Sequence, residues 1–464
     1  MPAIPRFNLA LLTSSGYPLG MQNLNESFAE LGLAVPDIWL PVEGTDLERW
    51  AVIACDQHTS DPGYWAQVEK KVGNSPSTLS LIFPEVYLNA ADADARMQRV
   101  AQAMQRYVDQ GVLQNCGSMA VLVDRQTPQV AHRTGLLLAV DLEHYDYRPD
   151  STSLIRASEG TILERLPPRV KIRRQASFEF PHVLILIDDP ERTVIEPLRR
   201  DRESFELLYD TRLMLGGGSV RGYAIREPQR LQRIAGALHA LRDPARLKER
   251  YGRDDAMLFA VGDGNHSLAT AKQVWQDKKA AGTPPADDPA RYALVEIINM
   301  HDSGLHVEPI HRVVDGIDAR TLADTLRSAI VSGKEPELMS PEQAVERVLQ
   351  TPQSPRSFAL LDGERALCYS LPDDSAASPA VLVQQTLESI EQTNGANIEI
   401  DYIHGTEAIL ELSRREGSLG LLVPPIEAGS LFQYVANNGP LPRKIFSLGE
   451  AEEKRYYFES RRIV

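Results

Sequence analysis

The sequence contains few cysteines, three in 464 residues. They are Cys55, Cys116 and Cys368, which lie far apart in the chain. An odd and scattered set of this kind indicates neither a disulfide framework nor a Cys-rich zinc site. The low cysteine content therefore favours a reducing, cytoplasmic setting.

Long apolar runs are also missing. No stretch of the sequence approaches the ~18 apolar residues of a membrane-spanning helix. The N-terminus begins Met1-Pro2 and has only a brief apolar run at 9–12, without the basic start and long apolar core of a secretory signal. We therefore expect no association with a membrane.

Positive charge is scarce relative to negative charge. Lys and Arg together number 49 against 64 Asp and Glu, so the formal net charge is −15. A protein this acidic does not adhere broadly to nucleic acid, although a local basic pocket is compatible with its composition. The partner we expect is a small molecule or a nucleotide, and the sequence does not indicate an oligomeric state.

The remaining composition is typical of a soluble globular protein, with 43% hydrophobic and 24% charged residues. At ~150 residues per domain, the length allows two or three domains. Strand and helix patterns alternate, which predicts an α/β fold. We divide the chain into an N-terminal extension (1–35), an N-terminal α/β region (36–245) and a C-terminal α/β region (246–464), with one continuous domain as the alternative.

Several elements are indicated by hydrophobic periodicity. Helical spacing predicts a helix over 91–110 and a long helix over 228–251. A hairpin is expected from 119–123 to 134–140, and the continuous apolar run at 182–190 predicts a strand buried on both faces. Residues 316–395 predict helical and hairpin additions without evident chemistry.

The most informative stretch passes from an apolar segment at 257–261, through a polar cluster, into helical spacing from Leu268. The cluster consists of Asp263, Gly264, Asn265, His266 and Ser267. This order predicts a strand, a tight turn and a helix, whose N-terminal N–H groups attract anions. A bound phosphate is one interpretation. Capping of the helix by Ser267 or Asp263, with a packed His266, is the other.

Further polar groups stand near predicted elements. An apolar strand expected at 50–54 is followed by Asp56 and His58, and polar groups after a strand commonly belong to a site in α/β folds. A surface turn is the alternative. Glu159 lies in a stretch that precedes the basic run 169–174, whose guanidinium groups suit phosphate or carboxylate unless they form a solvated face.

Four histidines, at 266, 301, 306 and 311, lie close in sequence after this turn. Histidines so grouped raise the possibility of a zinc site. Residues 291–316 predict two strands: the first, 294–300, ends in His301 and Asp302, and the second follows a turn at Ser303-Gly304. His306 and His311 on the second strand point to opposite faces, so at most one of them joins His301 or His266. We therefore assign no metal ligand, and phosphate binding or proton transfer by a histidine remains open.

These motifs together resemble the domain-of-unknown-function 1015 family of bacterial and archaeal proteins. The family's strand and Asp-Gly-His-His-Arg turn matches 263–267, and its Gly-Leu…Pro-x-His-Arg strand matches Gly304, Leu305, Pro309, His311 and Arg312. Its Tyr-x-His and Pro-x-Lys elements match Tyr402 with His404 and Pro442 with Lys444. The resemblance covers roughly residues 36 to 450, and it implies ligand-binding roles for His311, Arg312 and Lys444.

Two departures from the family pattern concern anion binding. Asn265 and Ser267 stand where the family has His and Arg, so a bidentate anion contact must come from Arg312 or Lys444. Ile445 and Phe446 replace the Ser-Thr that usually follows the family's Lys.

The turn also resembles, more remotely, that of the ParB and sulfiredoxin superfamily, whose members bind nucleotides and include free-serine kinases. This resemblance implies a mixed α/β sheet with a ParB/sulfiredoxin-like strand–turn–helix core.

The function we hypothesise is a nucleotide-binding phosphotransferase that uses ATP or ADP with Mg²⁺ on a small metabolite. Asp263 would hold the metal or act as base, His266 would bind phosphate, and Asp56 with His58 would complete the pocket. The other expected ligand-binding residues are Glu159, Gly264, Asn265, Ser267, His311, Arg312 and Lys444. A metal-dependent hydrolase using His266, His301 and His311, and a non-catalytic nucleotide-binding module, are the alternatives.

Overall fold

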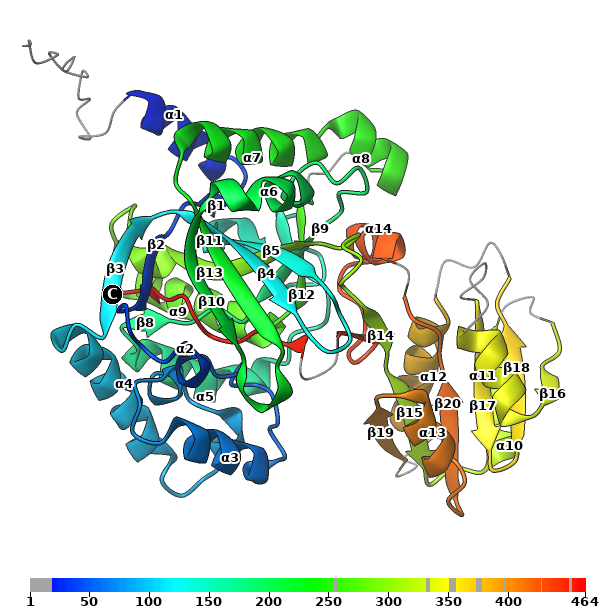
Figure 1. Ribbon diagram of the computed structural model, residues 1–464. Coiled ribbons are helices and arrows are strands. Elements are labelled where there is room, and N and C mark those ends of the chain that lie inside the picture. The colour runs from blue at the N-terminus through cyan, green and yellow to red at the C-terminus, as the bar shows by residue number, and fades with distance from the viewer. Residues whose placement is uncertain are drawn as a thin grey trace, which may run out of the picture.

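The computed structural model describes most of the chain as two lobes (Figure 1). The described residues are 19–253, 257–330, 334–349, 356–372, 378–394, 398–426, 428–449 and 453–464. Residues 1–18 of the predicted N-terminal extension lie outside the described residues. No helix in the described ranges is long and apolar enough to cross a membrane.

The larger lobe is built on a ten-stranded mixed sheet. Its order is β10 (Glu206–Arg212), β11 (Ser219–Ile225), β4 (Ala120–Gln126), β5 (Arg133–Asp141), β13 (Tyr292–Asn299), β9 (Leu184–Ile187), β12 (Phe259–Asp263), β7 (Ile155–Ala157) and β6 (Tyr145–Asp146), with β1 (Leu33–Ala34) on β5. The pairs β13–β9, β12–β7 and β7–β6 are parallel and the others are antiparallel. The predicted α/β class is thereby confirmed as a mixed sheet.

Helices cover both faces of this sheet, because its central strands are apolar on both sides. On β5, Leu136 and Leu138 belong to one hydrophobic core and Leu137 to another. The first core includes α1 (Leu19–Ala29), α6 (Ile195–Asp201), α7 (Pro228–Leu241) and α9 (Asn265–Ala281). The second includes α2 (Leu47–Trp50), α3 (Pro62–Val72) and α4 (Ala93–Asp109). Figure 1 shows α1, α6 and α7 on one side of the lobe and α3 and α4 on the other.

The smaller lobe is a six-stranded antiparallel sheet with its own helices (Figure 1). Its strand order is β16 (Glu337–Met339), β18 (Arg365–Ser370), β17 (Ser357–Asp362), β20 (Ser418–Leu422), β15 (His311–Asp315) and β19 (Glu399–Ile403). Its helices are α10 (Ala319–Ala329), α11 (Pro341–Leu349), α12 (Pro379–Asn394) and α13 (Thr406–Leu412). The helices and the hairpin expected within 316–395 are all present in this lobe.

Short segments complete the fold. A two-stranded ribbon of β14 (Val307–Pro309) and β21 (Phe446–Leu448) carries the chain into the smaller lobe and back. The others are α5 (Leu166–Gln175), α8 (Pro244–Tyr251), α14 (Ala428–Asn438), and the pairs β2 (Asp37–Pro41) with β3 (Leu113–Ser118) and β8 (Phe178–Glu179) with β22 (Arg461–Arg462). The boundary expected near residue 245 falls inside α8, and strands from both sides of it enter the large sheet.

Most strong periodic signals correspond to observed elements. The helix expected at 91–110 is α4, the hairpin is β4–β5, and the buried strand at 182–190 is β9, whose residues are all buried. The stretch at 257–272 forms a strand, a turn and a helix, as β12 and α9.

Three expected elements differ from the structure. The helix at 228–251 is divided into α7 and α8, because Pro244 starts a new helix that Asp243 caps. The segment 50–54 makes a single bridge, from Ile53 to Tyr456, instead of a strand. The strand expected after His301 is divided into β14 and β15, which belong to different sheets.

Candidate functional site

A cavity of about 880 Å³ opens where β12 meets α9. A volume of this size lies within the range of small-molecule and cofactor sites, roughly 300–1,000 Å³. Of the predicted site residues, the wall includes Asp56, Glu159, Asp263, Gly264, Asn265, His266, Ser267 and Lys444. Ile310 and His404 line it from the smaller lobe, so both lobes contribute to one cavity.

The turn between β12 and α9 depends on a glycine. Gly264 is the N-cap of α9 with a left-handed φ of 80°, a conformation that glycine adopts without steric cost. It offers no side chain to the first-turn N–H groups, and Oδ1 of Asp263 instead accepts a hydrogen bond from the Gly264 N–H at 2.8 Å. The capping interpretation, in which Ser267 or Asp263 caps the helix, is therefore wrong. The helix N-terminus faces the cavity as an anion-attracting end.

Asp263 forms an ion pair that the sequence did not indicate. Nζ of Lys454 lies 2.9 Å from Oδ2 of Asp263 and also donates to the carbonyl oxygen of Leu448. Burial opposes ionisation of Asp263, but the Lys454 charge and its hydrogen bond outweigh it and lower the pKa of the carboxyl below its ordinary value. Both carboxylate oxygens of Asp263 are thus engaged, one by Gly264 and one by Lys454.

Glu159 and Lys444 are brought to the cavity by pairing between distant loops. A parallel bridge joins Glu159 to Leu441, and the N–H of Leu441 donates to the carbonyl oxygen of Ser158 at 2.7 Å. Burial raises the pKa of Glu159 to about 7, although the charge of Lys444 opposes the rise. Lys444 has a φ of 59°, an uncommon conformation for a residue with a side chain. The site therefore holds a carboxyl that titrates near neutral pH beside an ammonium group.

His266, in the first turn of α9, is a neutral imidazole. Its Nε2 accepts a hydrogen bond from the N–H of Ile162 at 3.2 Å, which leaves the ring proton on Nδ1. Burial, with the positive charges of Arg169 and Arg165, lowers the pKa of His266 to about 4. At neutral pH this histidine can donate one hydrogen bond from Nδ1, but it supplies no positive charge to a phosphate.

Asp56 lies opposite a second histidine, His182. Nε2 of His182 is 3.8 Å from Oδ2 of Asp56, and both side chains line the cavity. Oδ1 of Asp56 accepts a hydrogen bond from the side-chain amide of Gln57 at 3.0 Å. Neither His182 nor Lys454 was a sequence candidate.

The basic run on α5 is partly committed to internal ion pairs. Arg169 binds Glu85 through two nitrogens, and Arg173 lies 2.6 Å from Glu179. All four side chains line the cavity, so these pairs contribute little net charge to it. Arg165, just before α5, is exposed and also lines the cavity, where it adds to the positive charge of Lys444.

Three predicted ligand-binding residues do not line the cavity. The ring of His58 stacks on Tyr64 with centroids 3.7 Å apart. Nδ1 of the buried His311 accepts a hydrogen bond from the N–H of Val423 at 3.3 Å. Arg312 is fully buried and donates to the carbonyl oxygen of Lys444 at 3.0 Å. His58 was expected at the site because it follows a predicted strand, and His311 and Arg312 because of the family resemblance. Arg312 reaches the cavity wall through the backbone carbonyl groups of Lys444 and Ile310.

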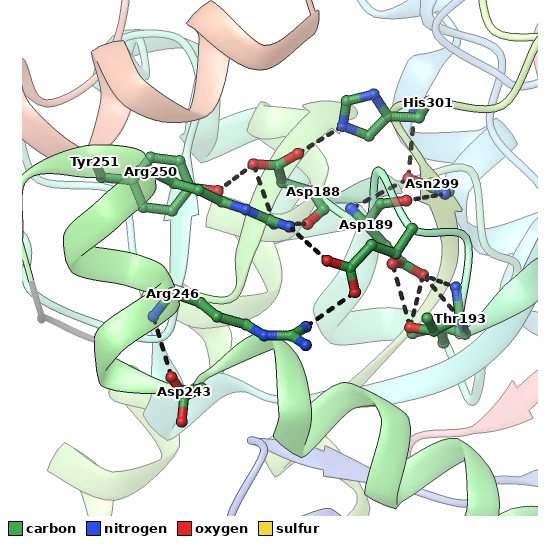
Figure 2. A network of polar contacts seen from close by, with 11 residues as sticks. Asp188, Asp189, Thr193, Asp243, Arg246, Arg250, Tyr251, Asn299 and His301 are labelled. Atoms are coloured by element: carbon green, nitrogen blue, oxygen red, sulfur yellow. Dashed lines mark hydrogen bonds and ion pairs between the residues drawn. The ribbon is translucent and has the colours of Figure 1, made fainter.

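The histidine cluster considered for the metal-dependent hydrolase alternative does not form, because His301 faces a separate polar network (Figure 2). Its Nε2 lies 2.6 Å from Oδ1 of Asp188, whose other oxygen accepts from the hydroxyl of Tyr251. Asp189 accepts the N–H groups of Thr193 and Val194 and so ends β9 in a turn. No group of three His, Cys, Asp or Glu side chains within the described ranges could hold a metal ion. His266, His301 and His311, which the metal-dependent hydrolase alternative would use, do not form such a group.

Comparisons with solved structures found distant similarities of fold. A mutant of a free serine kinase in complex with ADP is 11% identical with a TM-score of 0.37, over 70% of this chain and 92% of that chain. SbnI with C-terminal truncation from Staphylococcus aureus is 11% identical with a TM-score of 0.34, over 68% and 82%. A conserved hypothetical protein from Pyrococcus furiosus is 12% identical with a TM-score of 0.33, over 69% and 90%. At such low identities and TM-scores these similarities carry no conclusion about function.

A search of curated proteins gave no match. The family comparison is specific, because a single family model matches residues 40–391 and so includes the cavity-lining turn and Glu159. The elements around His404 and Lys444 lie beyond the matched range. The chain belongs to the family described as protein of unknown function (DUF1015).

Proposed function

We propose that this protein is a cytoplasmic nucleotide-binding phosphotransferase, which transfers a phosphoryl group between ATP or ADP and a small metabolite. The observation that carries the proposal is the opening of the α9 N-terminus into one cavity with Lys444 and Glu159. Phosphoryl transfer depends on positioning and charge neutralisation more than on covalent chemistry of the protein. A cavity of about 880 Å³ has room for a nucleotide together with a second small ligand.

The charged groups of the cavity wall support the binding of phosphate groups. Lys444, Arg165 and the N–H groups at the start of α9 would hold phosphoryl oxygens, since cations and helix N-termini stabilise phosphate charge. His266 would add one neutral donor from Nδ1. Asn265 and Ser267 stand in the same turn and would bind as hydrogen-bonding side chains in place of a charged one.

The carboxylates divide into two roles. Glu159, with a pKa of about 7, would act as the general base toward the acceptor hydroxyl, because a base works best when its pKa lies near the operating pH. Asp263 is already engaged by Lys454 and Gly264, so we assign it to holding the turn in place. Asp56 would hold Mg²⁺ together with phosphate oxygens, an arrangement that needs only one or two protein carboxylates. When bound, Mg²⁺ would neutralise phosphate charge.

The proposal is tested by ligand-induced thermal stabilisation. ATP or ADP with Mg²⁺ should raise the melting temperature, since a ligand that binds only the native state stabilises it by about 2.7 kcal/mol at a hundred times its Kd. Lys444→Ala should reduce the shift strongly, whereas Lys248→Ala, on the exposed side of α8 and away from the cavity, should leave it unchanged. Absence of any shift with ATP, ADP or CTP, with and without Mg²⁺, would refute the proposal.

A non-catalytic nucleotide-binding module is the second candidate. Asp263 is paired with Lys454, and His266 accepts a hydrogen bond from Ile162. These two contacts favour the second candidate, because both side chains already have partners within the protein. Binding without phosphoryl transfer to any of a panel of small hydroxyl metabolites would select this candidate over an enzyme.

We further propose that β12 and α9 correspond to the strand–turn–helix of the ParB and sulfiredoxin superfamily. The Asp-Gly turn with its left-handed glycine supports this relationship.

A further inference from the structure

His182 is a cavity residue for which the proposed function has no role so far. It lies two residues before β9, and β9 pairs antiparallel with β12, so that Leu184 is the register partner of Asp263. This pairing places the start of β9 beside the β12–α9 turn, where a Cβ on Gly264 would be 3.0 Å from the backbone of Val183. His182 therefore stands next to the anion-attracting end of α9.

The hydroxyl of Tyr457 holds the ring of His182 at its Nδ1 side. This hydroxyl accepts a hydrogen bond from the N–H of Cys55 at 3.0 Å, and its oxygen lies 2.8 Å from Nδ1 of His182. The hydroxyl oxygen has two lone pairs, so with the Cys55 N–H bound it can either donate to Nδ1 or accept from it. We infer that the hydroxyl is the donor, which makes Nδ1 the acceptor and places the ring N–H on Nε2.

That proton is directed into the cavity. Nε2 of His182 faces Asp56 across 3.8 Å, which is longer than a hydrogen bond, so this nitrogen is available to a ligand atom that approaches from the cavity. The side chain of His182 is 12% exposed and that of Asp56 is 25% exposed, and both line the cavity. Tyr457 holds the ring at Nδ1, and Nε2 is available to a ligand in the cavity.

We propose that His182 binds a phosphoryl oxygen of the ligand through Nε2–H, as an aimed neutral donor whose tautomer Tyr457 sets. The proposal rests on the proposed phosphate-binding function and adds a residue to it. Asp56 lies opposite the same nitrogen at 3.8 Å, beyond hydrogen-bond distance, so it leaves this donor to the ligand. A donor–phosphate hydrogen bond is charge-assisted and contributes more than a neutral pair.

Two substitutions separate this role from simple packing. Gln places its side-chain nitrogen near the position of Nε2, whereas the shorter Asn places it near Nδ1. His182→Gln should therefore keep the affinity for ADP with Mg²⁺, and for inorganic pyrophosphate, within about threefold, while His182→Asn should weaken both about tenfold or more. His306→Gln, an exposed histidine that does not line the cavity, is the matched control and should bind as the wild type does.

The tautomer is measured without any ligand, by nitrogen-15 NMR of the histidine rings. The wild type should show His182 protonated at Nε2, and Tyr457→Phe should remove the preference. Protonation at Nδ1 in the wild type, or equal binding by the Asn and Gln variants, overturns the proposal while the phosphotransferase proposal stands. If neither ADP nor pyrophosphate binds the wild type, both proposals fail.

Discussion

At the scale of single residues, the pKa values of two carboxyl groups in one cavity are shifted in opposite directions. Asp263 has an ammonium partner in Lys454 and two hydrogen bonds, so it stays ionised despite burial. Glu159 also lies near Lys444, but burial dominates and its pKa rises to about 7. Pairs of titratable groups whose environments separate their pKa values are typical of acid–base sites. This contrast is the reason for assigning the base role to Glu159.

The raised pKa of Glu159 predicts a specific dependence of stability on pH. The unfolded chain ionises this group near 4.5 and the folded chain near 7, so the folded state binds the extra proton within that window. The stabilisation is complete below pH 4.5 and is lost as the pH rises through 7. Glu159→Gln removes this dependence on pH. Between pH 4.5 and 7, the free energy of unfolding of the wild type should therefore fall by on the order of 2–3 kcal/mol relative to that of the variant.

Urea unfolding at several pH values, in buffer without phosphate, measures this difference. Glu164→Gln, which removes an exposed carboxyl a few residues away, is the control and should follow the wild type. A constant difference between wild type and Glu159→Gln at all pH values would show that Glu159 ionises normally.

Arg312 shows how a residue can matter to the site without touching the ligand. Its guanidinium group is fully buried, contacts Gln384, lies over the ring of Tyr402 at 5.6 Å and donates to the carbonyl oxygen of Lys444. The last bond links β15 of the smaller lobe to the residue that presents an ammonium group to the cavity. Arg312 therefore supports the backbone conformation of Lys444.

At the scale of elements, the β12–α9 turn holds the site together because Gly264 fits two constraints. Its φ is 80°, and a Cβ would stand 3.0 Å from Cα and 3.1 Å from Cγ2 of Val183. An alanine at this position would have to adopt a left-handed backbone conformation, and its Cβ would crowd Val183. Gly264→Ala should lower the free energy of unfolding by about 1–3 kcal/mol and weaken ADP binding, because the first turn of α9 moves.

The matched control for this turn is Gly236→Ala, in the interior of α7, where nothing stands within 4 Å of the added Cβ. This substitution should stabilise the protein by about 0.5–1 kcal/mol, since alanine favours a helix interior. Chemical denaturation measures both variants. An equal effect of the two substitutions would mean that the turn adapts and that glycine is not required at 264.

The elements also show how far the sequence could predict the site. The β12–α9 turn is predictable because a change from strand to helical spacing around Asp263 and Gly264 is a local signal. The partner of Asp263 is Lys454, 191 residues away, in a C-terminal segment that carries no motif. His182 precedes a strand that was predicted correctly, but its place beside the turn depends on the antiparallel pairing of β9 with β12. Such pairings are set by the whole sheet, so the pattern along the chain does not contain them.

At the scale of the whole molecule, the cavity is a shared feature of two lobes with separate sheets (Figure 1). The larger lobe supplies the turn and Glu159, while Ile310 and His404 at the ends of β15 and β19 come from the smaller lobe. Among the described residues, the chain passes between the two lobes only through the β14–β21 ribbon and the segments that flank it. A ligand in the cavity would therefore contact both lobes and stabilise their arrangement.

Hydrogen exchange followed by mass spectrometry tests this shared site. ADP with Mg²⁺ should protect backbone amides at 158–162, at the start of α9 and near Lys444 together with His404, because binding suppresses local opening wherever the ligand makes contact. Peptides from α10 serve as the internal control, since this helix belongs to the smaller lobe and none of its residues lines the cavity. Protection confined to the larger lobe would show that the smaller lobe takes no part in binding, and the roles given to Lys444 and Arg312 would then have to be abandoned.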